Sequence, residues 1–136
     1  MRIFVAVLVR VAAMGIALAG YYAAIPYLFP DDGGGANIGA GLIAFGALLL
    51  ISFGWAFVDG HARGISPTLI VWAIVAAVLS LGWLVARAVA EADASMSATE
   101  IVTHDLGSLP FTLGIVLAPA AIGVLIGSAL RPSQAQ

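Results

Sequence analysis

The sequence contains no cysteine and no lysine, and only 9% of its residues are charged. Without cysteine the chain cannot form a disulfide, hold a cysteine-ligated cluster or use a thiolate nucleophile, which excludes the four-helix thiol oxidoreductases. Without lysine it cannot form a Schiff base, which excludes retinal-type pigments. The net charge of -2 is small and no basic patch is present, so we expect no nucleic-acid partner.

The chain is instead rich in apolar residues, which make up 62% of it and give a mean hydropathy of +1.13. A water-soluble domain carries about 25% charged residues, so this chain must face lipid. A helix of about 20 apolar residues crosses the hydrocarbon core of a bilayer. Four runs reach this length, at about 3–27, 36–58, 67–90 and 109–130. They predict an all-α, polytopic membrane protein with a single four-helix transmembrane domain folded as an antiparallel bundle.

The first apolar run contains an A-x-A-like pattern at Ala17-Leu18-Ala19, which leaves a cleaved signal peptide as an alternative. The run continues past this pattern as far as Phe29. We therefore expect a retained span.

The arginines predict the orientation, because cytoplasmic loops and ends carry the excess of basic residues. Four of the five arginines fall on the side of the predicted termini, and only Arg87 falls on the other. We therefore expect both termini in the cytoplasm and the chain in the plasma (inner) membrane of a bacterium. The side with four arginines holds Arg2, Arg10, Arg63 and Arg131, and the opposite side holds Asp31, Asp32, Glu91, Asp93, Glu100 and Asp105.

The stretch "FVDGHARGISP", residues 57–67, places an acid, a histidine and an arginine between two apolar runs. Gly60 and Gly64 predict a tight cytoplasmic hairpin over residues 59–66, and Ser66-Pro67 predicts the start of the next helix, with serine as its N-cap. The alternative is a small anion or metal site formed by Asp59, His61 and Arg63, although this is a poor ligand set.

Arg10 is the one charge clearly inside an apolar run, and an ionisable residue at that position is a candidate functional residue. Helical rise places Ser52 at nearly the depth of Arg10, with Asp59 one to two turns nearer the cytoplasm. We predict that Arg10 pairs with Asp59, with Ser52 nearby. Two alternatives stay open, in which Arg10 extends its guanidinium to the interface or binds a substrate or lipid headgroup.

The longest connection, residues 91–108, is too long for a simple turn and predicts a short interfacial helix over about 98–106. Ser97-Ala98-Thr99-Glu100 matches a capping box, and Val102 and Leu106 form an apolar face. Glu100 and His104 lie one turn apart on the opposite face, as half of a metal site would. The preferred interpretation is a solvated helical face with no metal.

Small residues predict where helices approach one another closely. Gly123 and Gly127 form a G-x-x-x-G in the fourth run, and Gly39, Ala40, Ala44 and Ala47 form a stripe on the second. The sequence does not decide whether these faces pack within the bundle or against another chain.

Aromatic residues near the ends of the runs predict anchors at the membrane interfaces. On the outer side these are Tyr21, Tyr22, Tyr27, Phe29 and Trp83, and on the inner side Trp55, Phe57 and Trp72.

Several membrane chemistries lack the residues they need. His61 and His104 lie on opposite sides, so they cannot hold haem as a facing pair. No acid falls in the middle of a run, where proton-coupled exporters carry a carboxylate, and the few serines and threonines do not line a pore. No nucleophile shares a depth with a base. We expect no enzymatic activity and no cofactor.

The sequence favours a non-catalytic accessory or assembly subunit that packs against a larger membrane protein complex, with lipid and other subunits as its partners. The second interpretation is a small homo-oligomeric channel or transporter for an anion or lipid-like substrate, with Arg10 as its binding residue. The third is an outer-face cation-binding protein that uses Glu100 and His104.

Overall fold

The structure is a computed structural model that describes residues 2–29, 35–93 and 95–131. Asp31 and Asp32, which the sequence places in an acidic outer loop, lie outside these residues. The described residues are helical throughout, apart from short connections. The elements are α1 (Arg2–Leu28), α2 (Gly35–Arg63), α3 (Ile65–Glu91), α4 (Ala98–Asp105), the 3-10 turn η1 (Leu106–Ser108) and α5 (Leu109–Ala129).

The all-helical fold contains four stretches long and apolar enough to cross a membrane. They are Ile3–Leu28, Ile38–Arg63, Ile65–Glu91 and the stretch Ala98–Ala129 that includes α4 and α5, and their most apolar segments have mean hydropathies of 2.2 to 2.5. Each also exceeds the roughly 20 residues that a hydrocarbon core requires. The chain is therefore an all-helical bundle with the composition of an integral membrane protein.

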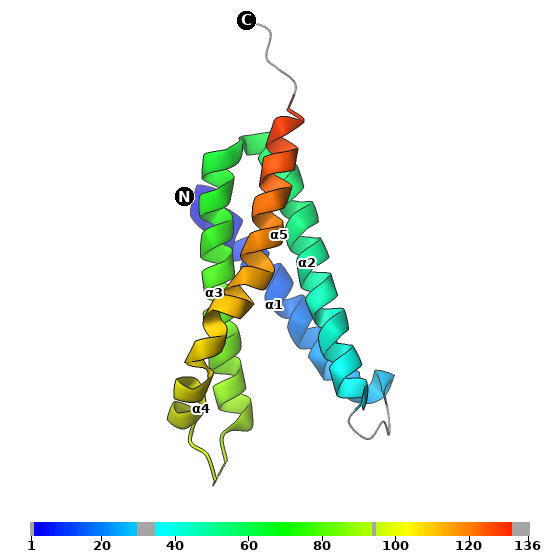
Figure 1. Cartoon of the computed structure of the whole chain (residues 1–136), viewed down its shortest axis with the longest axis vertical. Coiled ribbons are helices and arrows are strands. Elements are labelled where there is room, and N and C mark those ends of the chain that lie inside the picture. Colours follow the sequence, from blue (N-terminus) through cyan, green and yellow to red (C-terminus); the bar gives the residue numbers. More distant parts are fainter. Residues whose placement is uncertain (1, 30–34, 94, 132–136) are drawn as a thin grey trace, which may run out of the picture.

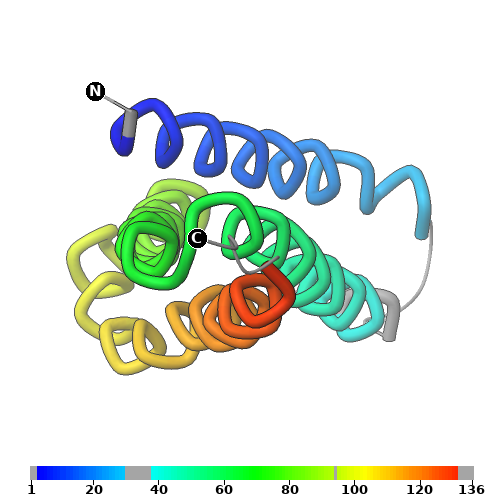
Figure 2. The backbone as a smooth tube through the Cα atoms, turned by 90° about the horizontal axis from the view of Figure 1, so that it is seen from above, coloured from blue at the N-terminus to red at the C-terminus, as the bar shows by residue number. Residues whose placement is uncertain are grey.

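The helices form three layers, which Figure 2 shows end on, with α1 on one side, α2 and α3 in the middle, and α4 and α5 on the other side. Figure 1 shows that the start of α1, the junction of α2 with α3 and the end of α5 lie toward the same end of the molecule, here called the junction end. From that junction α2 and α3 diverge toward the opposite end. The bundle is therefore closed at the junction end and wider at the other.

Glycine permits a very close approach of α2 and α5. A Cβ atom added at Gly127 would fall on the carbonyl oxygen of Phe57, 3.0 Å from the backbone nitrogen of His61. One added at Gly123 would likewise meet Phe53, and one at Gly60 would lie 2.8 Å from the Cα of Val124. Such distances leave no room for a side chain, so backbone packs on backbone here. The G-x-x-x-G of the fourth run therefore packs inside the bundle.

The junction differs from the predicted hairpin over residues 59–66. Helix α2 continues through Arg63, and Gly64 alone separates it from α3, with a φ of 87° that favours glycine. Gly60 lies within α2, because its missing side chain serves packing against α5 and not a turn. The N-cap of α3 is Gly64 and not Ser66. Pro67 is tolerated in the first turn, where backbone N–H groups have no helical partner.

Aromatic contacts connect the helices on the wide side of the bundle. The rings of Tyr22 on α1 and Trp83 on α3 lie 5.3 Å apart, and those of Phe45 on α2 and Phe111 on α5 lie 5.9 Å apart. Tyr21 donates a hydrogen bond of 2.9 Å to the Ala40 carbonyl oxygen. Large rings span separations that small residues cannot, so these contacts replace the backbone packing of the closed end.

We expect Gly127→Ala to lower the free energy of unfolding by about 1–3 kcal/mol, because the added methyl group forces α2 and α5 apart. Gly114→Ala in the same helix is the matched control, since nothing lies within 4 Å of a Cβ there. It should leave stability unchanged or raise it by up to about 1 kcal/mol through helix propensity. An SDS unfolding titration in mixed micelles measures both variants, and equal effects would contradict the packing at Gly127.

Candidate functional site

The candidate site is an ion pair between Arg10 of α1 and Asp59 of α2. The Arg10 Nε donates to Asp59 Oδ2 at 2.9 Å, and Nη2 donates to Oδ1 at 2.6 Å and also contacts Oδ2. Arg10 is 4% exposed and Asp59 6% exposed, so both charges are buried. Two parallel N–H to oxygen contacts make a bidentate pair, which fixes the orientation of both side chains.

The remaining hydrogen-bonding capacity of the Arg10 guanidinium is directed at its own helix and at two indole rings. Nη1 donates to the Ala6 carbonyl oxygen at 2.6 Å. The guanidinium carbon lies 5.0 Å from the centre of the Trp55 ring and 6.0 Å from that of Trp72. Both distances are within the range of a cation–π interaction, which is stronger when water is excluded. Groups from α1, α2 and α3 therefore all contact the cation.

Asp59 is held from α3 as well as from α1. The indole Nε1 of Trp72 donates to Asp59 Oδ2 at 3.2 Å. The hydroxyl of Thr68 lies 3.3 Å from the Asp59 backbone oxygen and donates to it. The carboxylate thus accepts hydrogen bonds from side chains of two different helices, and its position is the point where α1, α2 and α3 meet.

The energetic consequence is that neither charge can be removed alone. A buried ion pair gains little net stability when compared with apolar residues, because desolvation offsets the attraction. Breaking it from one side leaves the other charge buried and unpaired, which costs about 3–5 kcal/mol. Both Arg10 and Asp59 are therefore needed to hold α1 in its position against α2.

The structure brings together the two residues that helical rise predicts as partners, and it places Ser52 in the same helix as Asp59. The Arg10 guanidinium is buried against α2 and α3 and pairs with Asp59. Ser52 is wholly buried, and its hydroxyl has no hydrogen-bond partner among the residues that the structure describes. Ser52 therefore lies in the same helix as Asp59 but makes no hydrogen bond to the ion pair.

Two expectations from the sequence are wrong at this site. Trp72 is not an interfacial anchor, because it is wholly buried and donates to Asp59. Asp59 is not in a hairpin loop, because α2 continues four residues beyond it and Asp59 lies in the last turns of the apolar stretch Ile38–Arg63. The signal for Trp72 is its spacing, since a residue near the start of α3 faces the end of α2 across the short junction.

The opposite end of the bundle carries a second charged cluster around α4. The capping box forms there, with Ser97 nitrogen donating to Glu100 Oε2 at 2.8 Å and Glu100 nitrogen donating to the Ser97 hydroxyl at 3.4 Å. The Glu100 carboxylate is directed at Ser97, and His104 contacts Asp105 at 3.1 Å. Glu100 and His104 line one open surface pocket, but each already contacts a neighbour in the chain. Within the described ranges, no group of three His, Asp or Glu side chains gathers as a metal site would require.

Asp105 and Arg87 are the residues of this end that sequence reasoning missed. Arg87 Nη1 lies 3.0 Å from Asp105 Oδ2, which connects α3 to α4. This oxygen accepts no hydrogen bond of good geometry, so the contact is an ion pair without a hydrogen bond. Ile101 and Asp105 are the buried residues of α4, whereas the sequence favours Val102 and Leu106. The available signal was that Arg87 is the one arginine on the acidic side.

Asp93 contacts the residues just before α4. Its Oδ1 accepts hydrogen bonds from the Ser95 hydroxyl at 2.6 Å and from the backbone nitrogens of Ser95 at 2.7 Å and Met96 at 3.1 Å. The hydrogen bond from the Ser95 side chain, followed by those from the two backbone groups, holds the pKa of Asp93 below its ordinary value. The carboxylate serves to shape the loop.

A double-mutant cycle tests the ion pair. Arg10→Ala and Asp59→Ala should each lower the free energy of unfolding by about 3–5 kcal/mol, because each leaves one buried charge unpaired. The double variant should lose much less than the sum, since it leaves no unpaired charge. SDS unfolding titrations of the four proteins measure the coupling energy.

The control cycle uses Arg87→Ala and Glu91→Ala, an exposed pair at i, i+4 with contacts of 3.1 Å. Its coupling should stay below about 1 kcal/mol, because water screens exposed pairs. Strictly additive losses for Arg10 and Asp59 would contradict the buried pair.

No family model, no curated protein and no solved structure matches the chain.

Proposed function

We propose that this chain is a non-catalytic integral membrane protein that serves as an accessory or assembly subunit of a larger membrane protein complex. The observation that carries the proposal is the saturation of the buried charges, since Arg10 and Asp59 neutralise each other and are both hydrogen-bonded. A residue that binds or moves a substrate must offer an unsatisfied group to it. The function is then supplied by the outer surface of the bundle.

The surface of α1 supports this proposal. This helix forms a layer of its own, as Figure 2 shows. Many of its large apolar side chains are exposed. Phe4 is 71% exposed, Leu8 55% and Ile16 73%. Gly60, Gly123 and Gly127 pack between α2 and α5, whereas Gly15 and Gly20 of α1 have nothing within 4 Å of an added Cβ, so a partner helix on α1 would meet both small and large residues.

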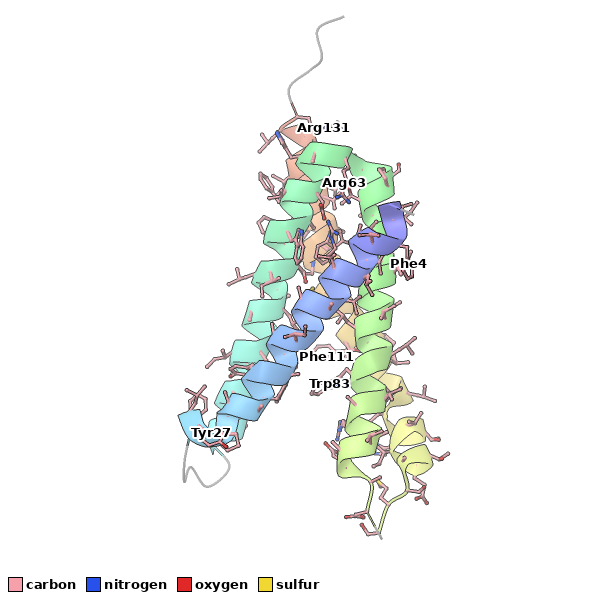
Figure 3. All side chains as sticks on the ribbon, turned by 180° about the vertical axis from the view of Figure 1, so that it is seen from behind. Phe4, Tyr27, Arg63, Trp83, Phe111 and Arg131 are labelled. Carbon is pink, nitrogen blue, oxygen red and sulfur yellow. The ribbon has the colours of Figure 1, made fainter. Side chains whose placement is uncertain are left out.

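The proposed topology is an antiparallel four-span bundle with both termini in the cytoplasm. Arg63 and Arg131 lie at the junction end, as Figure 3 shows, whereas Glu91, Asp93 and Glu100 belong to the end of α3, the loop and α4. The positive-inside rule assigns the arginine-rich end to the cytoplasm. A plasma (inner) membrane of a bacterium is the proposed location.

Isolation from the native membrane tests the accessory role. The tagged protein, purified in mild detergent and analysed by native mass spectrometry, should appear in a fixed ratio with other polypeptides. A pure homo-oligomer would contradict this role and support the alternative, a small channel or transporter for an anion or lipid-like substrate.

Cross-linking locates the surface that is used, and the absence of cysteine makes the design simple. Leu8→Cys and Ile16→Cys, labelled with a maleimide benzophenone, should cross-link to a second polypeptide after illumination of native membranes. Met14→Cys on the same helix is the control, because Met14 is only 2% exposed. Equal yields at all three positions, or none at any, would contradict a partner on α1.

Single cysteines also test the topology. We expect His61→Cys near the junction to react with a membrane-impermeant maleimide only in inverted vesicles, and Ser95→Cys in the α3–α4 loop only in right-side-out vesicles. Both residues are exposed, so accessibility to the reagent depends on the side of the membrane alone. The reverse pattern would overturn the N-in, C-in orientation.

A further inference from the structure

A groove of about 890 Å³ opens on the surface beside the buried ion pair. Its walls come from the first three turns of α1, the end of α2 and the start of α3. Most of its lining is apolar, and Arg10, Asp59 and Arg63 supply the charges. The apolar lining residues include Ile3, Val5, Val9, Trp55, Pro67 and Val71. A groove with such walls, on helices that lie in a membrane, is accessible to acyl chains.

The net charge of the groove comes from Arg63. Asp59 and Arg63 are four residues apart on α2, a spacing at which an acid and a base normally pair. Asp59 instead turns inward to Arg10 and Trp72, and its carboxylate is buried. Arg63 is exposed, and among the described residues no carboxylate lies within ion-pair distance of it. Because Asp59 pairs with Arg10, Arg63 has no carboxylate partner among the residues that the structure describes.

The position of Arg63 suits a lipid headgroup. Four residues of helix correspond to about 6 Å, so Arg63 lies about 6 Å further along α2 than the buried pair, toward the helix end. Figure 3 shows Arg63 close to the junction and near the start of α1. The apolar side chains of α1 and α3 continue from there toward the middle of the bundle. A cation at the interface with an apolar wall below it is complementary to an amphiphilic anion.

We propose that this groove binds one anionic phospholipid, with its phosphate at Arg63 and an acyl chain along the apolar wall formed by α1 and α3. The guanidinium offers two parallel donors to phosphate oxygens, and this pairing is stronger where water is partly excluded. Arg10 holds the floor of the groove through Asp59 and does not contact the phosphate. The lipid would join α1, which forms one outer layer, to α2 and α3 of the middle layer. This inference goes beyond the accessory role and does not depend on it.

Lipid titration followed by native mass spectrometry tests the proposal. The delipidated protein is titrated with dioleoylphosphatidylglycerol or with dioleoylphosphatidylcholine, which has the same chains. We expect one phosphatidylglycerol per chain to bind at least about tenfold more tightly than phosphatidylcholine, in keeping with a charge-assisted contact. Arg63→Gln should remove this preference and leave weak binding of both lipids.

Arg131→Gln is the matched control, because Arg131 carries the same charge at the same end but does not line the groove. It should keep the preference for phosphatidylglycerol. If both variants lose the preference for phosphatidylglycerol equally, the lipid is held by the overall positive charge of this end and not by a specific site. That result would overturn the proposal. Circular dichroism of each variant establishes that it is folded.

Two further arms distinguish the occupants. Val9 lines the groove and is half-exposed, so Val9→Trp should narrow the groove. We expect this variant to bind phosphatidylglycerol more weakly although Arg63 is unchanged. Glycerol phosphate should not compete at millimolar concentration, because it lacks the chain. Competition by glycerol phosphate would identify a site for free phosphate. If Val9→Trp binds phosphatidylglycerol as tightly as the unmodified protein, the proposal is overturned. It is also overturned if Arg63 binds a co-purified protein with an acidic segment and no lipid.

Discussion

The ion pair between Arg10 and Asp59 is the interaction on which the arrangement of the bundle depends. Helix α1 forms a separate layer, and among its described residues only Ala6, Arg10 and Met14 are buried. Among the described residues, its polar connections to the other helices are the salt bridge near the junction end and the Tyr21 hydrogen bond near the other end. Because an unpaired charge in an apolar interior is costly, each partner of the salt bridge holds the other in place.

Close packing of α2 on α5 provides the frame in which this pair can form. The glycine contacts fix α5 against the last turns of α2, where Asp59 lies, and the single-residue junction at Gly64 brings the start of α3 alongside. Trp72 and Thr68 of α3 then reach Asp59. Backbone packing, junction and ion pair thus lie at one end of the molecule. The other end is joined by aromatic rings and by Arg87 with Asp105, which allows the helices to diverge.

The same geometry explains why the surface, and not the interior, is the basis of the functional proposals. The buried carboxylate and guanidinium bind each other and are also held by Trp72 and by the Ala6 carbonyl oxygen, so neither charge is free to bind a substrate. Turning Asp59 inward has an opposite effect outside, because it deprives Arg63 of its helical neighbour in the sequence. The pairing of Asp59 with Arg10 therefore has two effects. It neutralises the buried arginine, and it leaves Arg63 as the net positive charge of the groove. A lipid in that groove would contribute to holding α1, which the protein alone holds at few points.

The sequence by itself determines that this is an all-helical chain with four apolar stretches, because length and hydropathy are sums over neighbouring residues. It also predicts the Arg10–Asp59 partnership, since helical rise converts residue number into depth, and the capping box at Ser97, which is a local pattern. It does not predict that Gly60 packs in a helix, that Trp72 is buried or that Arg87 reaches Asp105. Those features depend on the rotation of each helix and on which helices are neighbours. Only tertiary packing decides them, because hydropathy in a membrane protein is nearly equal on the faces turned to lipid and to protein.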